Sequence, residues 1–116
     1  MNDRATYQAN AVVHFDISGA DDDALRRFYG DLLDWHVDPK GPGYAVVDTP
    51  GGLAGSIVGD PRPGVTLGVA VEDLEQTVGQ ATELGGTVLM PPTDNGWVTK
   101  AQIRDPAGNV LTLIQK

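Results

Sequence analysis

The residues best suited to chemistry lie on one predicted strand near the start of the chain. His14 and Asp16 alternate with Val13, Phe15 and Ile17, so the two-residue period of a strand places them together on a polar face. An imidazole changes charge near neutral pH, so His14 can anchor a polar ligand or carry a proton. His14 and Asp16 are therefore the candidate catalytic residues.

Other strands offer side chains suited to ligand binding. Tyr44 and Trp97 head two corresponding predicted strands, 44–49 and 97–104, from which their rings could stack on a flat apolar molecule. Gln102 is central in its strand and can hydrogen-bond a ligand. Lys100 and Arg104, on the same face, fit a solvated surface better. The expected ligand is a small, partly apolar or aromatic molecule.

Several other kinds of chemistry lack the residues they need. The chain has no Cys, which excludes disulfides, a thiolate nucleophile and thiolate metal sites. It has no nucleophile elbow, phosphate loop or dinucleotide-binding glycine pattern. The run 21–23, three Asp residues, fits a helix N-terminus and lacks the spacing of a twelve-residue calcium loop.

The charge of the chain narrows the choice of partners. The formal net charge is −8, and the 8 Lys and Arg residues are scattered, which disfavours nucleic acids and anionic membrane surfaces. No stretch approaches the ~20 apolar residues of a membrane span, and the polar start lacks a signal-peptide core. We therefore expect neither nucleic acid nor membrane as a partner, and a cytoplasmic location.

A strand–helix unit that occurs twice organises the chain. The segment 12–35, VVHFDISGADDDALRRFYGDLLDW, returns in altered form from position 65 as VTLGVAVEDLEQTVGQATELGG, and three strands are predicted after each helix. We expect one domain over 1–116, with modules at about 12–58 and 65–115 and a hinge at 59–64. The predicted fold class is α+β, with two βαβββ modules forming a cup-shaped mixed sheet whose helices lie on the outer face.

The apolar spacing also predicts which side chains turn inward. The predicted helices are 22–33 and 74–84, and a strand at 87–90 should end at Pro91-Pro92. The small residues Gly55, Thr66, Gly68 and Ala70 should leave room for a ligand in the middle of the sheet. The side chains expected to face inward from the helices are Leu25, Phe28, Tyr29, Leu32, Leu33, Val78, Ala81 and Leu84.

Nearly the whole chain, about 12–115, resembles the vicinal oxygen chelate superfamily. The resemblance rests on the doubled βαβββ order and on FYGDLLDW at 28–35, VAVEDL at 69–74, ELGG at 83–86 and DPAGNVLTL at 105–113. That superfamily includes glyoxalase I, bleomycin-resistance proteins, extradiol dioxygenases and fosfomycin-resistance transferases. The resemblance implies the fold more firmly than the chemistry, because this fold carries many activities.

In metal-dependent members, the resemblance implies ligands on the first and last strands of each module. These positions fall on His14, on Thr66, on Gly55 or Ser56, and on Thr112, so one strong ligand of four survives. Asp16 would lie about 6–7 Å along the strand from His14. We therefore predict no metal and no cofactor, with Thr66 and Thr112 lining the site. The predicted ligand-binding set is His14, Tyr44, Thr66, Trp97, Gln102 and Thr112.

Three functions follow from these observations. The first is metal-free binding of a small molecule, as in the drug-sequestering members of the superfamily. The second is an enzyme of the lyase, isomerase or dioxygenase type that uses His14, either metal-free with Asp16 or with metal ligands not yet recognised. The third is a structural protein whose cup is filled by its own side chains. The resemblance also implies a homodimer.

Overall fold

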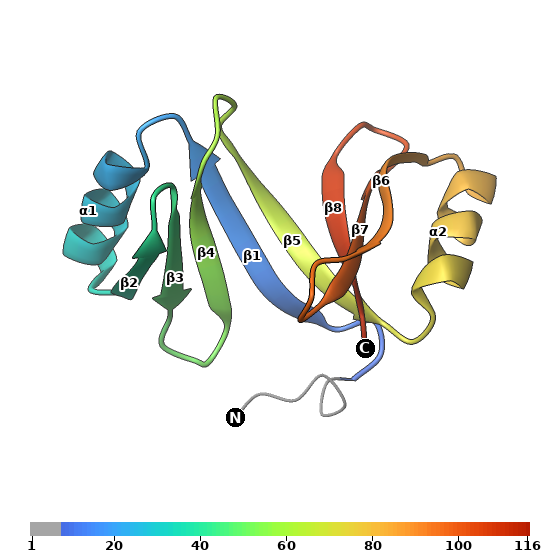
Figure 1. The fold of residues 1–116 in the computed structure, drawn as a ribbon, viewed down its shortest axis with the longest axis horizontal. Helices are drawn as coiled ribbons and strands as arrows, with labels where there is room; N and C mark the ends of the chain where they lie inside the picture. The colour runs from blue at the N-terminus through green and yellow to red at the C-terminus, as the bar shows by residue number, and fades with distance from the viewer. Residues whose placement is uncertain (1–7) are drawn as a thin grey trace. The chain divides into compact units, whose positions relative to one another are not determined.

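The computed structural model of the chain describes residues 8–116, which form two compact units (Figure 1). One unit contains His14–Thr66, and the other contains residues 8–13 together with Leu67–Lys116. Each module follows the order strand, helix, three strands. The predicted α+β class and the doubled βαβββ order are confirmed. Within 8–116, no helix is long and apolar enough to cross a membrane.

The strands of the first module lie in the order β2-β3-β4-β1, with β1 parallel to β4 and the other neighbours antiparallel. Asp21 begins the helix by accepting a hydrogen bond of 3.0 Å from the backbone N–H of Ala24, as an N-cap aspartate does. The elements are β1 (Val12–Gly19), α1 (Asp22–Leu33), β2 (His36–Gly41), β3 (Tyr44–Asp48) and β4 (Ala54–Gly59).

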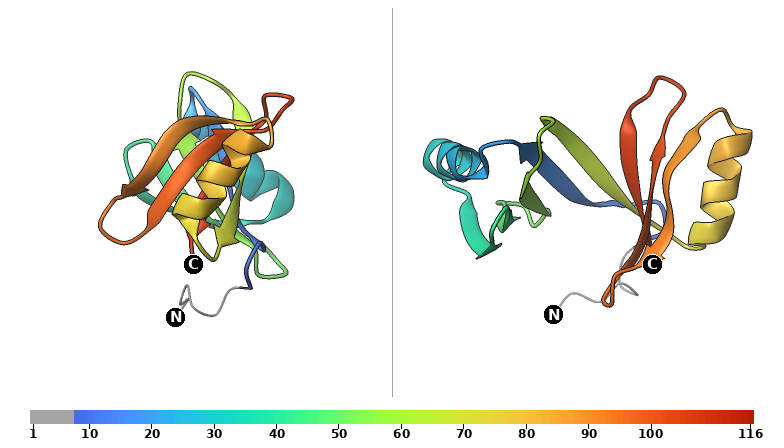
Figure 2. Two further views of the ribbon diagram at one scale, coloured as in Figure 1. Left: turned by 90° about the vertical axis from the view of Figure 1, so that its right-hand side faces the viewer. Right: turned by 45° about the horizontal axis from the view of Figure 1, so that its top comes forward.

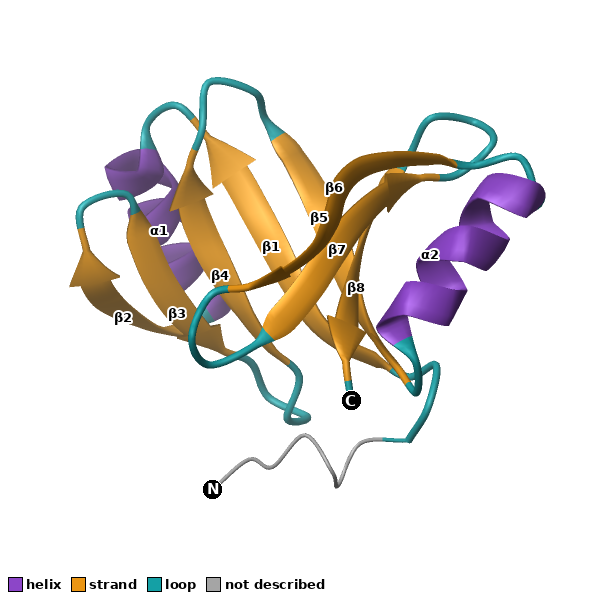
Figure 3. Ribbon diagram, turned by 45° about the vertical axis from the view of Figure 1, so that its right-hand side comes forward, coloured by secondary structure: helices purple, strands orange, loops and turns teal. Residues whose placement is uncertain are grey.

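The core of the first module lies between α1 and one face of its strands (Figure 3). Phe15, Ile17, Val47 and Ile57 are buried there, as the alternation of β1 predicts. Gly55 also faces this core, where a Cβ would overlap the ring of Phe15. The expectation that Gly55 leaves room for a ligand is therefore wrong, because the space it leaves holds the Phe15 ring. The partly buried side chains packed against this core are Leu25, Tyr29, Trp35 and Val37.

The inward stripe predicted for α1 is only partly correct. Leu25 and Tyr29, one turn apart, pack against the core, but no residue of the helix is fully buried. Phe28 is 56% exposed and Leu32 is 63% exposed. Residues four apart form a row along a helix, and the row of Phe28 and Leu32 is turned away from the sheet.

The strands of the second module lie in the order β5-β8-β7-β6, with β5 parallel to β8 (Figure 2). Its core contains Leu74 and Val78 of the helix. Leu84, which we expected to face inward, is 79% exposed because the helix ends at Glu83 and Leu84 is its C-cap. The elements are β5 (Gly64–Val71), α2 (Leu74–Glu83), β6 (Thr87–Asp94), β7 (Thr99–Arg104) and β8 (Val110–Gln115).

Strand β6 continues through Pro91-Pro92 to Asp94, so the predicted end at residue 90 is wrong. Proline has no N–H to donate to a neighbouring strand, which confines it to edge strands and bulges. β6 is at the end of the strand order, and its pairing with β7 shifts register between Met90 and Thr93. Both features let the strand accommodate the two prolines.

Candidate functional site

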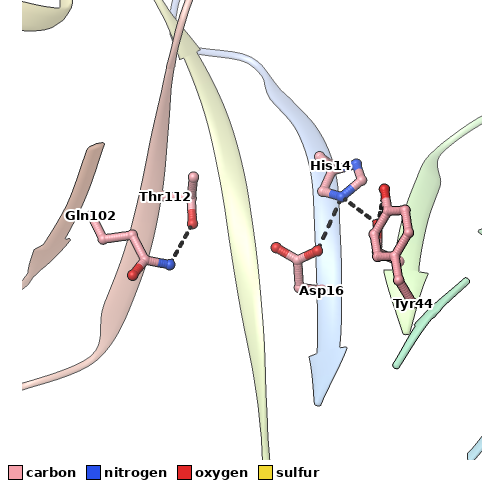
Figure 4. Close-up of polar contacts among 6 residues, drawn as sticks. His14, Asp16, Tyr44, Gln102 and Thr112 are labelled. Carbon is pink, nitrogen blue, oxygen red and sulfur yellow. Dashed lines mark hydrogen bonds and ion pairs between the residues drawn. The ribbon is translucent and has the colours of Figure 1, made fainter. Parts of the chain in front are cut away.

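Four polar side chains from three strands meet on the face of the first module that points away from α1. They are His14 and Asp16 of β1, Tyr44 of β3 and Ser56 of β4. Their strand neighbours Phe15, Ile17, Val47 and Ile57 pack toward the helix, so alternation directs these four to the opposite face. We call these four residues the His14 cluster. Figure 4 shows three of them labelled.

The imidazole of His14 contacts the carboxylate of Asp16. Their Nε2 and Oδ1 atoms are 3.1 Å apart, and the two side chains are about one-third exposed, 33% and 31%. The sequence placed the two residues on one face, about 6–7 Å apart along the strand. Their side chains reach toward each other above the strand and close that distance.

Ser56 is the member of the His14 cluster that belongs neither to the predicted ligand-binding set nor to the candidate catalytic residues. The parallel pairing of β1 with β4 places Ser56 opposite Asp16. Ser56 is only 2% exposed, its Oγ lies 3.2 Å from Nε2 of His14, and its hydroxyl donates to the hydroxyl of Tyr44 at 3.5 Å. Ser56 could have been found from the sequence, because the resemblance placed a metal-ligand position of the first module on either Gly55 or Ser56.

The geometry of the His14 cluster limits what it can do. A serine–histidine–aspartate triad needs the hydroxyl and the carboxylate on different ring nitrogens, but Ser56 and Asp16 both contact Nε2. The cluster is therefore not a nucleophilic triad. Nδ1 of His14 points away from these contacts (Figure 4), which leaves it available to a ligand or to a proton.

The His14 cluster does not fit a divalent metal ion. Such an ion in a protein usually needs three or more strong nitrogen or oxygen ligands. The cluster offers one imidazole, one carboxylate and neutral hydroxyls. Among residues 8–116, no three His, Cys, Asp or Glu side chains are grouped so that they could hold a metal. The metal-free interpretation rests on this donor set and stays a prediction.

Two further carboxylates, on β2 and β3, lie on the face of the sheet that carries the His14 cluster and add to the negative charge of Asp16. The register pairs Asp38 with Val46 and places Asp48 two residues further along β3, on the same face as Tyr44. The carboxylate of Asp38 is 2.8 Å from the ammonium of Lys40. This hydrogen bond lowers the pKa of Asp38 and raises the pKa of Lys40. The strands β1 to β4 contain no other Lys or Arg.

The second module brings together two of the predicted ligand residues. The amide of Gln102 donates a hydrogen bond of 3.3 Å to Oγ1 of Thr112, which lies opposite it in the pairing of β7 with β8 (Figure 4). Thr112 is 4% exposed. Because the Gln102 amide is engaged, it would have to exchange this partner to bind a ligand.

Among residues 8–116, the side chains of Trp97 and Thr66 form no hydrogen bond with the His14 cluster or with the Gln102–Thr112 pair. Trp97 does not head a strand as expected, because β7 starts at Thr99 and Trp97 lies in the turn before it. Its side chain is 82% exposed. Thr66 is half-buried in β5, and its role in binding stays a prediction.

Comparison with known proteins identifies the family to which the chain belongs. The family model described as "Glyoxalase-like domain" matches residues 8–114. The chain is 29% identical to the protein named "Putative glyoxylase CFP32" of Mycobacterium bovis, over 99% of this chain and 49% of that protein. The chain thus spans about half the length of the curated relatives it matches.

Solved structures share the fold at low sequence identity. A glyoxalase/bleomycin resistance protein/dioxygenase superfamily member from Vibrio splendidus 12B01 superposes with a TM-score of 0.71 at 18% identity, covering 93% of this chain and 100% of that one. Methylmalonyl-CoA epimerase from Mycobacterium tuberculosis gives a TM-score of 0.62 at 19% identity, covering 97% and 93%. At these identities the likeness establishes the fold alone.

Proposed function

This chain belongs to the glyoxalase-like domain family, and we propose that its first module binds a small, partly apolar or aromatic molecule without a metal ion. The binding surface is the face of β1, β3 and β4 that carries the His14 cluster. The observation behind the proposal is that Asp16 and Ser56 contact one ring nitrogen of His14, while no residue of 8–116 hydrogen-bonds the other. An orienting partner of this kind sets which nitrogen meets a ligand.

The surroundings of the His14 cluster suit a ligand with both polar and apolar parts. Tyr44 is 42% exposed and joins the cluster through its hydroxyl, so its ring can cover a flat molecule. Val46 and Val58 are half-buried on the same face, since they alternate with inward residues of β3 and β4. Binding sites for small molecules combine such apolar walls with a few polar groups.

The charges of this face favour a neutral or cationic ligand over an anion. Asp16, Asp38 and Asp48 contribute three carboxylates, and Lys40, the single Lys or Arg of the four strands, is already paired with Asp38. An anionic ligand would meet carboxylates without a free Lys or Arg to bind it.

A ligand screen by NMR with a matched pair of histidine variants tests this proposal. Any compound that shifts the His14 imidazole resonances should bind the His14→Ala variant at least about tenfold more weakly, the effect of losing roughly 1.4 kcal/mol. His36→Ala should bind it normally, because His36 is an exposed residue of β2 outside the cluster. Equal loss in both variants, or one tightly bound divalent ion per purified chain, would contradict the proposal.

A second candidate function is metal-free proton transfer, as in a lyase or isomerase. The observation that favours it is the carboxylate 3.1 Å from the His14 imidazole, because an acid–base histidine is commonly oriented by such a group. Turnover of an identified substrate should then disappear in His14→Ala and fall in Asp16→Asn. Full turnover by His14→Ala would exclude this function and leave simple binding. A dioxygenase would require metal ligands that the cluster does not supply.

We also propose that the protein is a homodimer joined through α1. The outer groove of this helix is lined by Ala24, Arg27, Phe28, Asp31 and Leu32, and Phe28 and Leu32 are more than half exposed. Arg27 and Asp31 lie one turn apart on it. In a dimer with a two-fold axis, Arg27 of each copy can therefore lie opposite Asp31 of the other. The groove is thus self-complementary in charge.

Sedimentation at several concentrations tests the homodimer. The wild-type chain should sediment as a dimer and Phe28→Asp as a monomer. Val65→Asp is the control, because Val65 is 66% exposed but lies in β5, and this variant should remain dimeric. A monomeric wild type would refute the proposal. The cytoplasmic location also stays a prediction, which cell fractionation would test.

A further inference from the structure

The turn between β6 and β7 holds an Asn-Gly pair in a defined geometry. Asp94 pairs with Thr99 at the base of the turn, and the backbone N–H of Asn95 donates to the carbonyl of Val98 at 3.0 Å. These contacts close a loop around Asn95 and Gly96. Both residues belong to the second module and are remote in sequence from the His14 cluster.

The side-chain carbonyl of Asn95 accepts two backbone hydrogen bonds. Its Oδ1 is 3.3 Å from the N of Trp97 and 3.1 Å from the N of Val98. Two N–H groups directed at one carbonyl oxygen withdraw electrons from the carbon, and they stabilise the oxyanion that forms when a nucleophile adds to it. The Cγ of Asn95 is therefore activated toward addition.

The adjacent backbone nitrogen is in contact with a base. The N–H of Gly96 donates to Oδ1 of Asp94 at 2.8 Å, and a carboxylate in this position can take the proton as the nitrogen attacks. Gly96 has a φ of +106°, and a Cβ placed on it would meet nothing within 4 Å. Gly96 therefore has no side chain of its own to hinder attack by its nitrogen.

We propose that this turn modifies itself, converting Asn95 to a mixture of isoaspartate and aspartate. The nitrogen of Gly96 bonds to Cγ of Asn95 as its proton passes to Asp94, and the tetrahedral oxyanion is held by the N–H groups of Trp97 and Val98. The Cγ–Nδ2 bond then breaks, ammonia leaves with the returned proton, and a five-membered succinimide remains. Water opens the succinimide at either carbonyl. The sum is one water consumed and one ammonia released.

The modification changes the surface next to an exposed aromatic ring. Either product replaces a neutral amide with a carboxylate. The isoaspartyl product also routes the main chain through the former side chain, which lengthens the turn by one methylene. Trp97, 82% exposed and two residues away, would be displaced. The turn would therefore alter the presentation of Trp97 as the protein ages.

Peptide mapping by mass spectrometry during incubation of the whole chain at neutral pH tests the proposal. The peptide containing Asn95 should gain the mass change of amide to acid, and its isoaspartyl form should elute separately. The native chain should react faster than the same chain in denaturant, where the contacts of the turn are lost. Asp94→Asn keeps an acceptor for the Gly96 N–H but removes the base, so it should slow the native reaction about tenfold or more.

Internal controls separate this reaction from general deamidation. Asn109 lies in an exposed turn but is followed by Val110, and it should remain unmodified over the same period. Thermal unfolding of Asp94→Asn should match wild type, which shows that the turn is retained. A native rate equal to or below the denatured rate, or an unchanged rate in a folded Asp94→Asn, would overturn the proposal.

Discussion

Ser56 and His14, 42 residues apart in the chain, are joined by a contact of 3.2 Å across the parallel strands β4 and β1. The same pairing in the second module places Thr112 opposite Gly68, which has no side chain. The two modules share one backbone plan but not this polar cluster. The polar contact that joins two strands in the first module therefore has no counterpart in the corresponding strand pair of the second.

Replacing Ser56 with alanine should disconnect His14 from Tyr44. Ser56 is 2% exposed, and the loss of a buried hydrogen bond should lower the free energy of unfolding by about 1 kcal/mol. Urea unfolding measures this change, and the imidazole NMR signals of His14 should shift. Ser18→Ala is the control, because its Oγ bonds the carbonyl of Arg62 instead. Unmoved His14 signals in Ser56→Ala would show that the contact does not form in solution.

The packing of Phe15 over Gly55 predicts opposite effects for two glycine substitutions. Gly55→Ala would place a Cβ within the Phe15 ring, and such overpacking should cost about 1–3 kcal/mol. Gly79→Ala should instead stabilise the protein by about 0.5–1 kcal/mol, because Gly79 lies inside α2 with nothing within 4 Å of its Cβ position. Denaturant unfolding of both variants checks the pair.

A compensating change distinguishes this packing from a general intolerance at position 55. Phe15→Leu should lose stability alone, but Gly55→Ala should then cost less in the Phe15→Leu background than in wild type. Strict additivity of the two costs would indicate that they do not share one space.

Local patterns predicted the elements that depend on neighbouring residues. The helix start at Asp21, the alternation of Phe15 and Ile17, and the order of both modules follow from capping and periodicity, which act within a few residues. The internal repeat predicted the doubled fold, and the resemblance connected that fold to a known superfamily and added a family position for His14. These parts of the structure could be predicted because their causes lie within the segments themselves.

Tertiary context decided the features that the sequence did not predict. The exposure of Phe28 depends on how far α1 is rotated against its sheet, and the continuation of β6 through its prolines depends on an edge position. Ser56 could be placed only once the register of β1 with β4 was known. The contact of His14 with Asp16 depends on side-chain reach, which backbone spacing does not give.

Protonation of Asp105 should lower the stability of the protein at acid pH. Its carboxylate accepts hydrogen bonds from the side chain and backbone N–H of Asn109 and from the N–H of Ala107, and these lower its pKa below the usual range. A carboxylate whose pKa is lowered on folding stabilises the folded state at pH values above the ordinary aspartate pKa. This stabilisation is lost as the pH falls through the pKa of the folded state. Wild type should therefore exceed Asp105→Ala in stability at neutral pH, and the difference should shrink below about pH 4.

Unfolding of both proteins across a pH series measures that difference. Asn109→Ala removes the largest cause of the lowered pKa, so it should lose part of the acid dependence while keeping the Ala107 hydrogen bond. A stability difference that stays constant from neutral pH to about pH 3 would show that Asp105 has an ordinary pKa in the folded state.

The two ends of α2 provide a matched test of which helix face is inward. Leu74 is 1% exposed in the core of the second module, whereas Leu84 is 79% exposed at the C-cap. Leu74→Ala should lower the free energy of unfolding by about 2–5 kcal/mol, because it leaves a cavity. Leu84→Ala makes the same chemical change at the surface and should stay within about 0.5 kcal/mol of wild type. Equal losses at the two positions would mean that Leu84 packs inward, as its spacing from Ala81 first indicated.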